Sequence, residues 1–235
     1  MVAKELFNPL KVYKKDLDVI DFLYKNLTQT NRSITVPFTN HCYYTLPLRH
    51  RVPVKYNIVD PDCFNFWTFA TQKPELLCNI SRSFFKAPAG EESDYFTMLE
   101  KKYHENKHPH LKPIITMILS RTNKNQNIFG GPYKINMDTC FSDWFYNKLR
   151  KYNSTEMQFA LREPIDCDNG FHIQHIPSPD SLACFELFEN DPPYDLFGQM
   201  KNFIFICDSE KEADKFDYDV KMKFESSILI AIVGF

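Results

Sequence analysis

The sequence predicts an α/β fold, because short apolar runs typical of strands alternate along its 235 residues with longer runs that have helical spacing. The β-branched run at 33–38 and the run at 54–62, which ends on acids, predict two strands. An amphipathic helix is expected before them at 15–27, and a helix broken near Pro74 is expected after them at 63–85. Strand, connection, strand and helix in this order are the start of an α/β sheet.

The rest of the chain continues this alternation, with a helical stretch in the middle. Helices are expected at 93–106, 112–123 and 138–153, a turn-rich loop at 124–138, and strands at 157–166, 183–189, 203–209 and 226–235. The helical stretch interrupts the strands, so we expect an α/β core of residues 1–92 and 154–235 with a helical, basic insertion at 93–153.

The composition indicates a packed protein without covalent or metal cross-links. Hydrophobic residues make up 43% of the chain and aromatic residues 15%, which excludes a disordered class. The seven cysteines lie far apart without a Cys-x-x-Cys pair, a pattern typical of reduced, buried thiols. No leader-like start and no apolar run near 18 residues occurs, so we expect an intracellular protein, cytoplasmic or nuclear, without a membrane partner.

Positive charge is concentrated in the middle of the chain. Residues 101–151 contain ten Lys or Arg and three acids, although the whole chain has a net charge of −2. A basic segment of this kind suits contact with a polyanion, and a solvated helical face would give the same pattern. In the same segment, His104, Glu105, His108 and His110 favour an exposed basic turn over a metal site, because Pro109 and the lysines disfavour a compact cluster.

The tetrapeptide Asp191-Pro192-Pro193-Tyr194 is the most specific motif in the sequence. The two prolines fix the backbone angle φ and remove two hydrogen-bond donors, which predicts a rigid turn at a strand end. The Asp191 carboxylate and the exposed carbonyls could accept hydrogen bonds from an adenine amino group, and Tyr194 could stack on a base extruded from a duplex. The alternative is an ordinary proline turn with a buried tyrosine.

An acid at the end of the second predicted strand is a second candidate. Such a residue in an α/β sheet commonly binds the ribose hydroxyls of a nucleoside. Asp60 is the favoured residue and Asp62 competes with it, while a helix N-cap is the alternative role for either.

Four blocks, taken in order and spacing, resemble the Dam-type adenine-specific DNA methyltransferases over roughly residues 10–235. The blocks are ITVPFTNHCYYTLP (34–47), YNIVDPDCFNFWTFATQKPELL (56–77), the insertion from Ser93 to Met137, and DPPY (191–194). The resemblance implies a Rossmann-like methyltransferase sheet, S-adenosylmethionine as the cofactor and transfer of a methyl group to the exocyclic amine of adenine. It implies DNA as the partner, with RNA left open, because the tetrapeptide recognises the base and ignores the sugar.

The resemblance also assigns roles to residues of this chain. The catalytic residues would be Asp191, Pro192, Pro193 and Tyr194, and the cofactor-binding residues Phe38, Thr39, Asn40, His41 and Asp60. The nucleic-acid-binding residues would be Lys101, Lys102, Arg121, Lys124, Asn127 and Lys134.

The chain departs from the family in two places. The turn after the first strand has no glycine; Asn40 could take a left-handed conformation, but His41 and Tyr43 place side chains where the family leaves space. Only residues 195–202 separate the tetrapeptide from the next strand, which is short for a substrate-binding wall. These departures would impair activity, and the alternative is an inactive methyltransferase-fold subunit that binds nucleic acid or serves assembly. In either case a protein partner could complete or replace the cofactor site.

Overall fold

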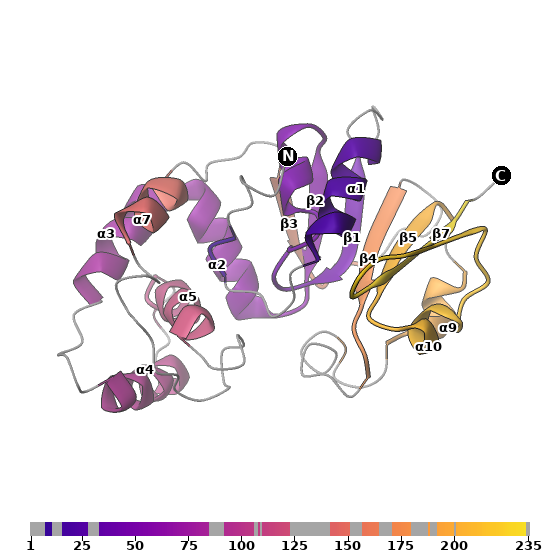
Figure 1. Cartoon of the computed structure of the whole chain (residues 1–235). Coiled ribbons are helices and arrows are strands. Elements are labelled where there is room, and N and C mark those ends of the chain that lie inside the picture. Colours follow the sequence, from indigo (N-terminus) through magenta and orange to yellow (C-terminus); the bar gives the residue numbers. More distant parts are fainter. Residues whose placement is uncertain are drawn as a thin grey trace. The chain divides into compact units, whose positions relative to one another are not determined.

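The computed structural model describes most of the chain as two compact units. The described residues are 8–10, 16–27, 33–84, 92–105, 108, 110–122, 142–150, 157–164, 171–179, 188, 192–199 and 201–233. Unit 1 comprises residues 1–6, 16–60 and 155–235, and unit 2 comprises 7–15 and 61–154 (Figure 1). The boundary therefore falls at Pro61 rather than at residue 93, where the sequence placed the start of the insertion.

Unit 1 is built on a seven-stranded sheet, which confirms the α/β class. The strands are β1 Ile34–Thr39, β2 Val54–Ile58, β3 Met157–Leu161, β4 Phe171–Ile176, β5 Phe203–Cys207, β6 Val220–Lys223 and β7 Ile228–Ile232. Their order across the sheet is β3-β2-β1-β4-β5-β7-β6. The first five are parallel, β7 pairs antiparallel with β5, and β6 pairs antiparallel with β7.

The chain changes direction across the sheet between β1 and β4. From β1 it moves outward to β2 and β3, and it then returns to the other side of β1 to form β4 and β5. The carboxyl ends of the five parallel strands lie along one edge, and the crevice beside such a reversal is where open α/β sheets bind ligands. This edge contains the end of β1, the end of β2 and the residues that follow β4 and β5.

Short or medium helical segments accompany the sheet in the described part of unit 1. They are α1 Leu17–Leu27, the 3₁₀ segment η1 Leu46–His50, α9 Tyr194–Phe197 and α10 Glu210–Ala213. Phe197 of α9 belongs to a fully apolar cluster with Phe203 and Phe205 of β5 and Ile230 of β7. α10 packs against β5 and β7, so this cluster is the core on the α9/α10 side.

Two strands were absent from the sequence prediction, and one predicted strand is not supported. β4 was missed because it carries His172 and Gln174, which are nevertheless buried, and β6 was missed because its residues are all exposed. Of the strand predicted at 183–189, only Phe188 is described, and its backbone is helical, which contradicts the strand at that residue. The other residues of that segment lie outside the described part of the chain.

Unit 2 is helical. The helices described in it are α2 Pro61–Gln72, α3 Pro74–Phe84, α4 Glu92–Glu105, α5 Lys112–Thr122 and α7 Asp143–Arg150. The break predicted near Pro74 is confirmed, since α2 and α3 are separated there. α2 packs mainly against α5, and α3 packs against α7, α2 and α5, which explains why residues 61–84 belong to this unit. The loop predicted at 124–138 lies outside the described residues.

No helix within the described ranges combines the length and the apolar character that crossing a membrane requires.

Candidate site at the carboxyl edge of the sheet

A glutamine side chain connects β1 and β4 at the reversal of strand order. The two strands pair through Ile34 with Phe171 and through Thr35 with His172. Closer to the carboxyl ends of the strands, the side chain of Gln174 connects them. Its Oε1 accepts from Phe38 N at 2.8 Å, and its Nε2 donates to Phe38 O at 3.0 Å and to His175 O at 2.7 Å. Gln174 is fully buried, so the backbone of Phe38 is fixed by this amide. Sequence reasoning missed Gln174, because a polar residue in a short run gave no sign of burial.

The turn after β1 is held by the side chains of Thr39 and Asn40. Thr39 Oγ1 accepts from Cys42 N at 2.9 Å, and Thr39 O accepts from Val59 N at 3.2 Å. Asn40 Oδ1 accepts from Asp60 N at 2.9 Å. The ends of β1 and β2 are therefore tied together, which brings the predicted cofactor-binding residues Thr39, Asn40 and Asp60 to one place.

The left-handed residue of this turn is Cys42 and not Asn40. Cys42 has a φ of 56°, a conformation that glycine adopts without strain and that costs other residues roughly 1–2 kcal/mol. The Cys42 side chain is buried, and burial raises the pKa of its thiol well above the ordinary value. The position therefore carries a side chain where the backbone geometry favours glycine.

Two tyrosines that follow Cys42 pack at this edge of the sheet. Tyr43 and Tyr44 are buried, their ring centroids lie 5.2 Å apart, and the Tyr44 ring lies 5.1 Å from that of His175 at the end of β4. Burial raises the pKa of Tyr43 to about 12, with a further rise from the carboxylate of Asp16. Burial also raises the pKa of Tyr44, which nearby Ser227 partly offsets. His41 is only partly buried, so Tyr43 and Tyr44 fill this edge more than His41 does.

The two acids after β2 have different environments. The Asp62 carboxylate accepts from Tyr103 Oη at 2.6 Å and pairs with Lys112 Nζ at 2.8 Å, both within unit 2. Asp62 therefore connects α2 to α4 and α5. Asp60 is half-buried and precedes α2 directly, so it is the acid at the carboxyl end of β2.

The ends of β4 and β5 are joined by Asp208. Its Oδ1 lies 3.0 Å from His175 Nε2, and its Oδ2 accepts from Ser178 N at 3.2 Å. Asp208 N in turn donates to Ile176 O at 3.1 Å. The segment that follows β4 at this edge is therefore Pro177 and Ser178, held by an acid that sequence reasoning did not single out.

The proline turn lies at the start of α9 and not at the end of a described strand. Pro193 directly precedes this helix, and Tyr194 is its first residue. The Tyr194 ring lies 5.6 Å from that of Phe216, with Lys215 Nζ 4.0 Å from its centroid. Asp191 lies outside the described residues.

The end of β1 and α9 are nonetheless neighbours. The ring of Phe38 lies 5.8 Å from that of Phe197 and 5.5 Å from that of Phe188. The contact is made by apolar rings on the α9/α10 side of the sheet. It joins the two predicted site regions through their packing residues, Phe38 and Phe197.

Arg121 and Lys101, two of the predicted nucleic-acid-binding residues, make contacts inside unit 2. Arg121 lies with its guanidinium 4.3 Å from the ring centroid of Phe145, and its Nη1 donates to Pro9 O at 3.4 Å. Lys101 Nζ lies 3.8 Å from Glu105 Oε1, in an exposed pair, and Lys102 is exposed. Lys124, Asn127 and Lys134 lie outside the described residues.

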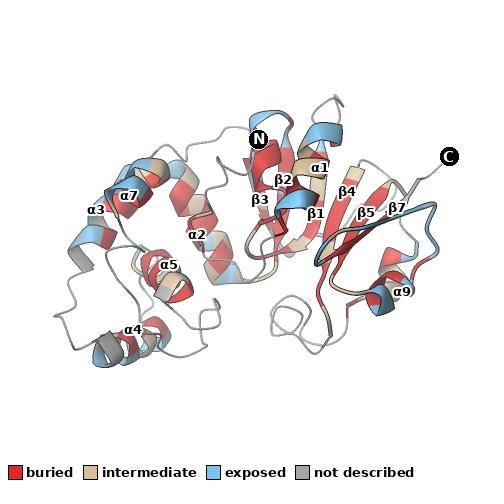
Figure 2. Ribbon diagram, viewed as in Figure 1, coloured by how far each residue is buried: buried red, intermediate tan, exposed pale blue. Residues whose placement is uncertain are grey.

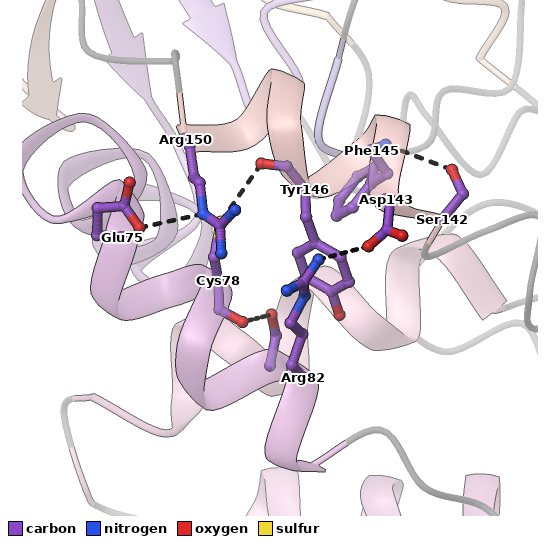
Figure 3. Close-up of polar contacts among 9 residues, drawn as sticks. Glu75, Cys78, Arg82, Ser142, Asp143, Phe145, Tyr146 and Arg150 are labelled. Atoms are coloured by element: carbon purple, nitrogen blue, oxygen red, sulfur yellow. Dashed lines mark hydrogen bonds and ion pairs between the residues drawn. The ribbon is translucent and has the colours of Figure 1, made fainter.

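Other cations of unit 2 join α3 to α7 (Figure 3). Arg150 Nε lies 3.1 Å from Glu75 Oε2, and Arg82 Nη2 lies 2.7 Å from Asp143 Oδ1. The Arg82 guanidinium also lies 4.6 Å from the ring centroid of Tyr146. These two pairs lie toward opposite ends of the two helices, and Arg150, a residue of the basic segment 101–151, therefore serves helix packing. In the described part of the chain, no three His, Cys, Asp or Glu residues are placed to hold a metal ion.

Comparison with known proteins adds no family to this description. No protein-family model matches the chain, and no curated protein matches it at a significant level. The four sequence blocks and their placement in the structure therefore carry the functional argument.

Proposed function

We propose that this chain has the sheet of a Rossmann-like methyltransferase, related to the adenine-specific enzymes, and works as a catalytically inactive nucleic-acid-binding or assembly subunit. The parallel order β3-β2-β1-β4-β5 supports the first part, since it is the order of a doubly wound nucleotide-binding sheet. β7 runs antiparallel between β5 and β6, so β6 has the same direction as the five parallel strands. Asp60 at the end of β2 stands where such a sheet has its ribose-binding acid.

The buried pair Tyr43–Tyr44 is the main observation in favour of a catalytically inactive chain. A nucleoside cofactor needs close approach of the backbone at the turn after β1, and glycine permits that approach. Here Cys42 holds the left-handed position, and Tyr43 packs on Tyr44, whose ring lies against His175 at the end of β4. The residues of this turn therefore do not fit S-adenosylmethionine bound in the usual way.

The position of Tyr194 supports the same proposal. A tyrosine that stacks on an extruded adenine needs one face of its ring open to the base. The Tyr194 ring instead contacts Phe216, and the ammonium group of Lys215 lies close to its centroid. Its packing is that of a tyrosine which anchors α9 to the apolar cluster.

Isothermal titration with S-adenosylmethionine, and with its demethylated product, tests the proposal directly. We expect no heat of binding up to high micromolar ligand. A saturable heat of binding that disappears in Asp60→Ala, while circular dichroism shows that this variant is folded, would contradict the proposal. It would show that the chain still binds the cofactor through Asp60.

An active adenine methyltransferase is the second candidate, favoured by the hydrogen bond that ties Asn40 to Asp60. That contact keeps the ends of β1 and β2 together, as a cofactor site requires. Transfer of a labelled methyl group to adenine in DNA and in RNA distinguishes the two functions. Incorporation that disappears in Asp191→Ala would establish the enzyme, and no incorporation is expected from the inactive subunit.

Binding of nucleic acid is tested by its salt dependence. Lys101 and Lys102 are the described cations of the predicted set that are exposed on α4. If this region contacts phosphates, affinity for DNA should fall steeply with salt, and the double variant Lys101→Ala/Lys102→Ala should reduce that slope by about two. Lys25→Ala/Lys55→Ala, two exposed lysines of unit 1, is the matched control. If the affinity for DNA does not change with salt, the chain does not bind nucleic acid through its phosphates, and assembly is the remaining role in this proposal.

A further inference from the structure

Helix α7 leaves a tryptophan exposed. The helix packs against α3 and buries Phe145, Tyr146 and Leu149, and Figure 2 shows that it has both buried and exposed residues. Helical spacing places Trp144 on the other side, where its exposed fraction is 57%. The second tryptophan of the chain, Trp67 in α2, is fully buried. An indole ring stabilises a fold most when it is buried, so the exposed Trp144 is better suited to a contact outside the fold.

A lysine lies beside this ring. Lys148 follows Trp144 by one helical turn, which places both side chains on the same side of α7. Its Nζ lies 5.9 Å from the centroid of the Trp144 ring. Attraction between a cation and an aromatic ring extends to about 6 Å, so the ring holds this ammonium group only weakly. Asn147 is exposed next to it, and the outward side of α7 therefore presents an aromatic ring, an amide and an ammonium group.

The acids of α3 and α7 do not neutralise Lys148, because arginines bind them. Asp143 Oδ1 lies 2.7 Å from Arg82 Nη2, and Glu75 Oε2 lies 3.1 Å from Arg150 Nε (Figure 3). Among the described residues, no carboxylate forms an ion pair with Lys148. The positive charge on the outward side of α7 is therefore available to an anion.

A similar pair in unit 1 differs in this respect. Tyr218 has an exposed fraction of 37%, and Lys221 Nζ lies 5.5 Å from the centroid of its ring. The same Nζ lies 2.9 Å from Asp214 Oδ1, so the charge of Lys221 is balanced within the unit. An exposed ring beside a lysine that has no acid partner is thus a property of α7 and not of every such pair in this chain.

We propose that Trp144 and Lys148 bind an unpaired nucleotide of a single-stranded nucleic acid, with the base stacked on the indole ring and a phosphate at the ammonium group. A single strand offers both partners at every nucleotide, an open base face and a negative charge. A duplex keeps its base faces stacked inside, so this pair suits unpaired strands. The segment 101–151 contains ten Lys or Arg and three acids, which favours a polyanion over an apolar partner. This inference deepens the nucleic-acid-binding role proposed above and rests on it.

Tryptophan fluorescence of the full chain tests the inference, because Trp67 is buried and Trp144 is exposed. The probes are an oligothymidine and an oligouridine of about ten nucleotides, and an abasic deoxyribose phosphate chain of the same length and charge. We expect saturable quenching by both oligonucleotides. The abasic chain should bind at least about fivefold more weakly than the oligothymidine, because it has no base to stack.

Variants assign the binding to the two side chains, with anisotropy of labelled probes as the measurement. Trp144→Ala should weaken binding of the oligothymidine at least about fivefold and leave binding of the abasic chain unchanged, whereas Trp144→Phe, which keeps a ring, should retain most of the affinity. Lys148→Ala should weaken both probes alike and lower the slope of log affinity against log salt by about 0.7. Tyr218→Ala, which removes the exposed ring beside a neutralised lysine, is the matched control.

Equal affinity of the native chain for the oligothymidine and the abasic chain would overturn the inference and leave a purely electrostatic nucleic-acid-binding role intact. This comparison needs no variant, so it decides the question even if Trp144→Ala unfolds α7. A Trp144→Ala variant that circular dichroism shows to be folded, and that binds both probes as the native chain does, would overturn it too. If the chain binds none of the probes, the inference fails together with the nucleic-acid-binding role, and a shift of the emission by vesicles of anionic phospholipid would assign this side of α7 to a lipid surface.

Discussion

The turn that follows β1 is held by hydrogen bonds, whereas the proline turn that precedes α9 is held by packed rings. In the first, Thr39 and Asn40 bind backbone groups of Cys42 and Asp60. In the second, Tyr194 contacts Phe216 and belongs to the residues packed on the apolar cluster of β5 and β7. Hydrogen bonds fix the positions of polar atoms, as a binding site requires, while ring packing mainly stabilises the fold. The two regions therefore differ in what a substitution should do.

The largest expected effect concerns the packed region. Phe197→Ala removes a fully buried ring that contacts Phe38, Phe205 and Phe216, and should lower the free energy of unfolding by about 4 kcal/mol. Urea denaturation of the purified chain measures it. Leu196→Ala, at the half-buried neighbour, is the control and should cost about 1 kcal/mol. Equal losses in the two variants would mean that α9 is not anchored through Phe197.

The next effect concerns the hydrogen-bonded region. Gln174→Leu keeps the size of the side chain but leaves the N–H and C=O of Phe38 without their partner, so unfolding should become easier by about 3 kcal/mol. Hydrogen exchange should show faster exchange of the Phe38 amide than in the native chain. Gln158→Leu, the same change at an exposed position of β3, should have little effect. An unchanged Phe38 exchange rate would show that Gln174 does not hold the two strands.

The sequence predicted those strands whose burial shows in their residue types. β1, β2, β5 and β7 lie within runs of apolar or β-branched residues, and all four were expected. β4 was not, because Gln174 and His172 are polar and their burial depends on partners from other strands and on the ring of Phe203. Only tertiary contacts could reveal it.

The candidate site was predictable to a similar extent. Asp60 was favoured in the sequence and Asp62, two residues later, competed with it. The contacts of Asp62 with Tyr103 and Lys112, far along the chain, distinguish the two acids. The sequence showed that the turn after β1 has no glycine. It did not show that Cys42 is the left-handed residue of this turn, because that depends on the backbone angles of the folded chain. The proline turn was expected at a strand end, and its place before α9 depends on the packing of Tyr194 and Phe197.

Alkaline pH should destabilise unit 1 through thiols in both regions. Burial raises the pKa of Cys42 in the turn and of Cys207 in β5, so both thiols stay neutral in the folded state while they ionise in the unfolded state. Their contribution to stability is complete below the unfolded pKa of 9.0 and is lost as pH rises toward the folded values. Each thiol should cost about 1.4 kcal/mol per pH unit above that point.

Thermal or urea unfolding between pH 7.5 and pH 10.5 measures this slope. Cys42→Ala should reduce it by the share of one thiol, about 1.4 kcal/mol per pH unit, leaving the parts due to Cys207 and to the other buried groups whose pKa is raised, Tyr43, Tyr44 and Cys78. A slope that Cys42→Ala does not change would mean that the Cys42 thiol is not buried in solution.

The smallest effect isolates the backbone of the turn after β1. Cys42→Gly and Cys42→Ala both remove the thiol, but only glycine takes the left-handed φ of 56° without strain. The glycine variant should therefore be more stable than the alanine variant by about 1 kcal/mol, the reverse of the order expected at an ordinary position. The difference in free energy of unfolding between the two, measured side by side, removes the packing contribution of the thiol. If the alanine variant were the more stable, position 42 would not be left-handed in solution. The backbone at Cys42 would then be no reason for the poor fit of this turn to a cofactor, and the side chains of Tyr43 and Tyr44 would remain as the reason.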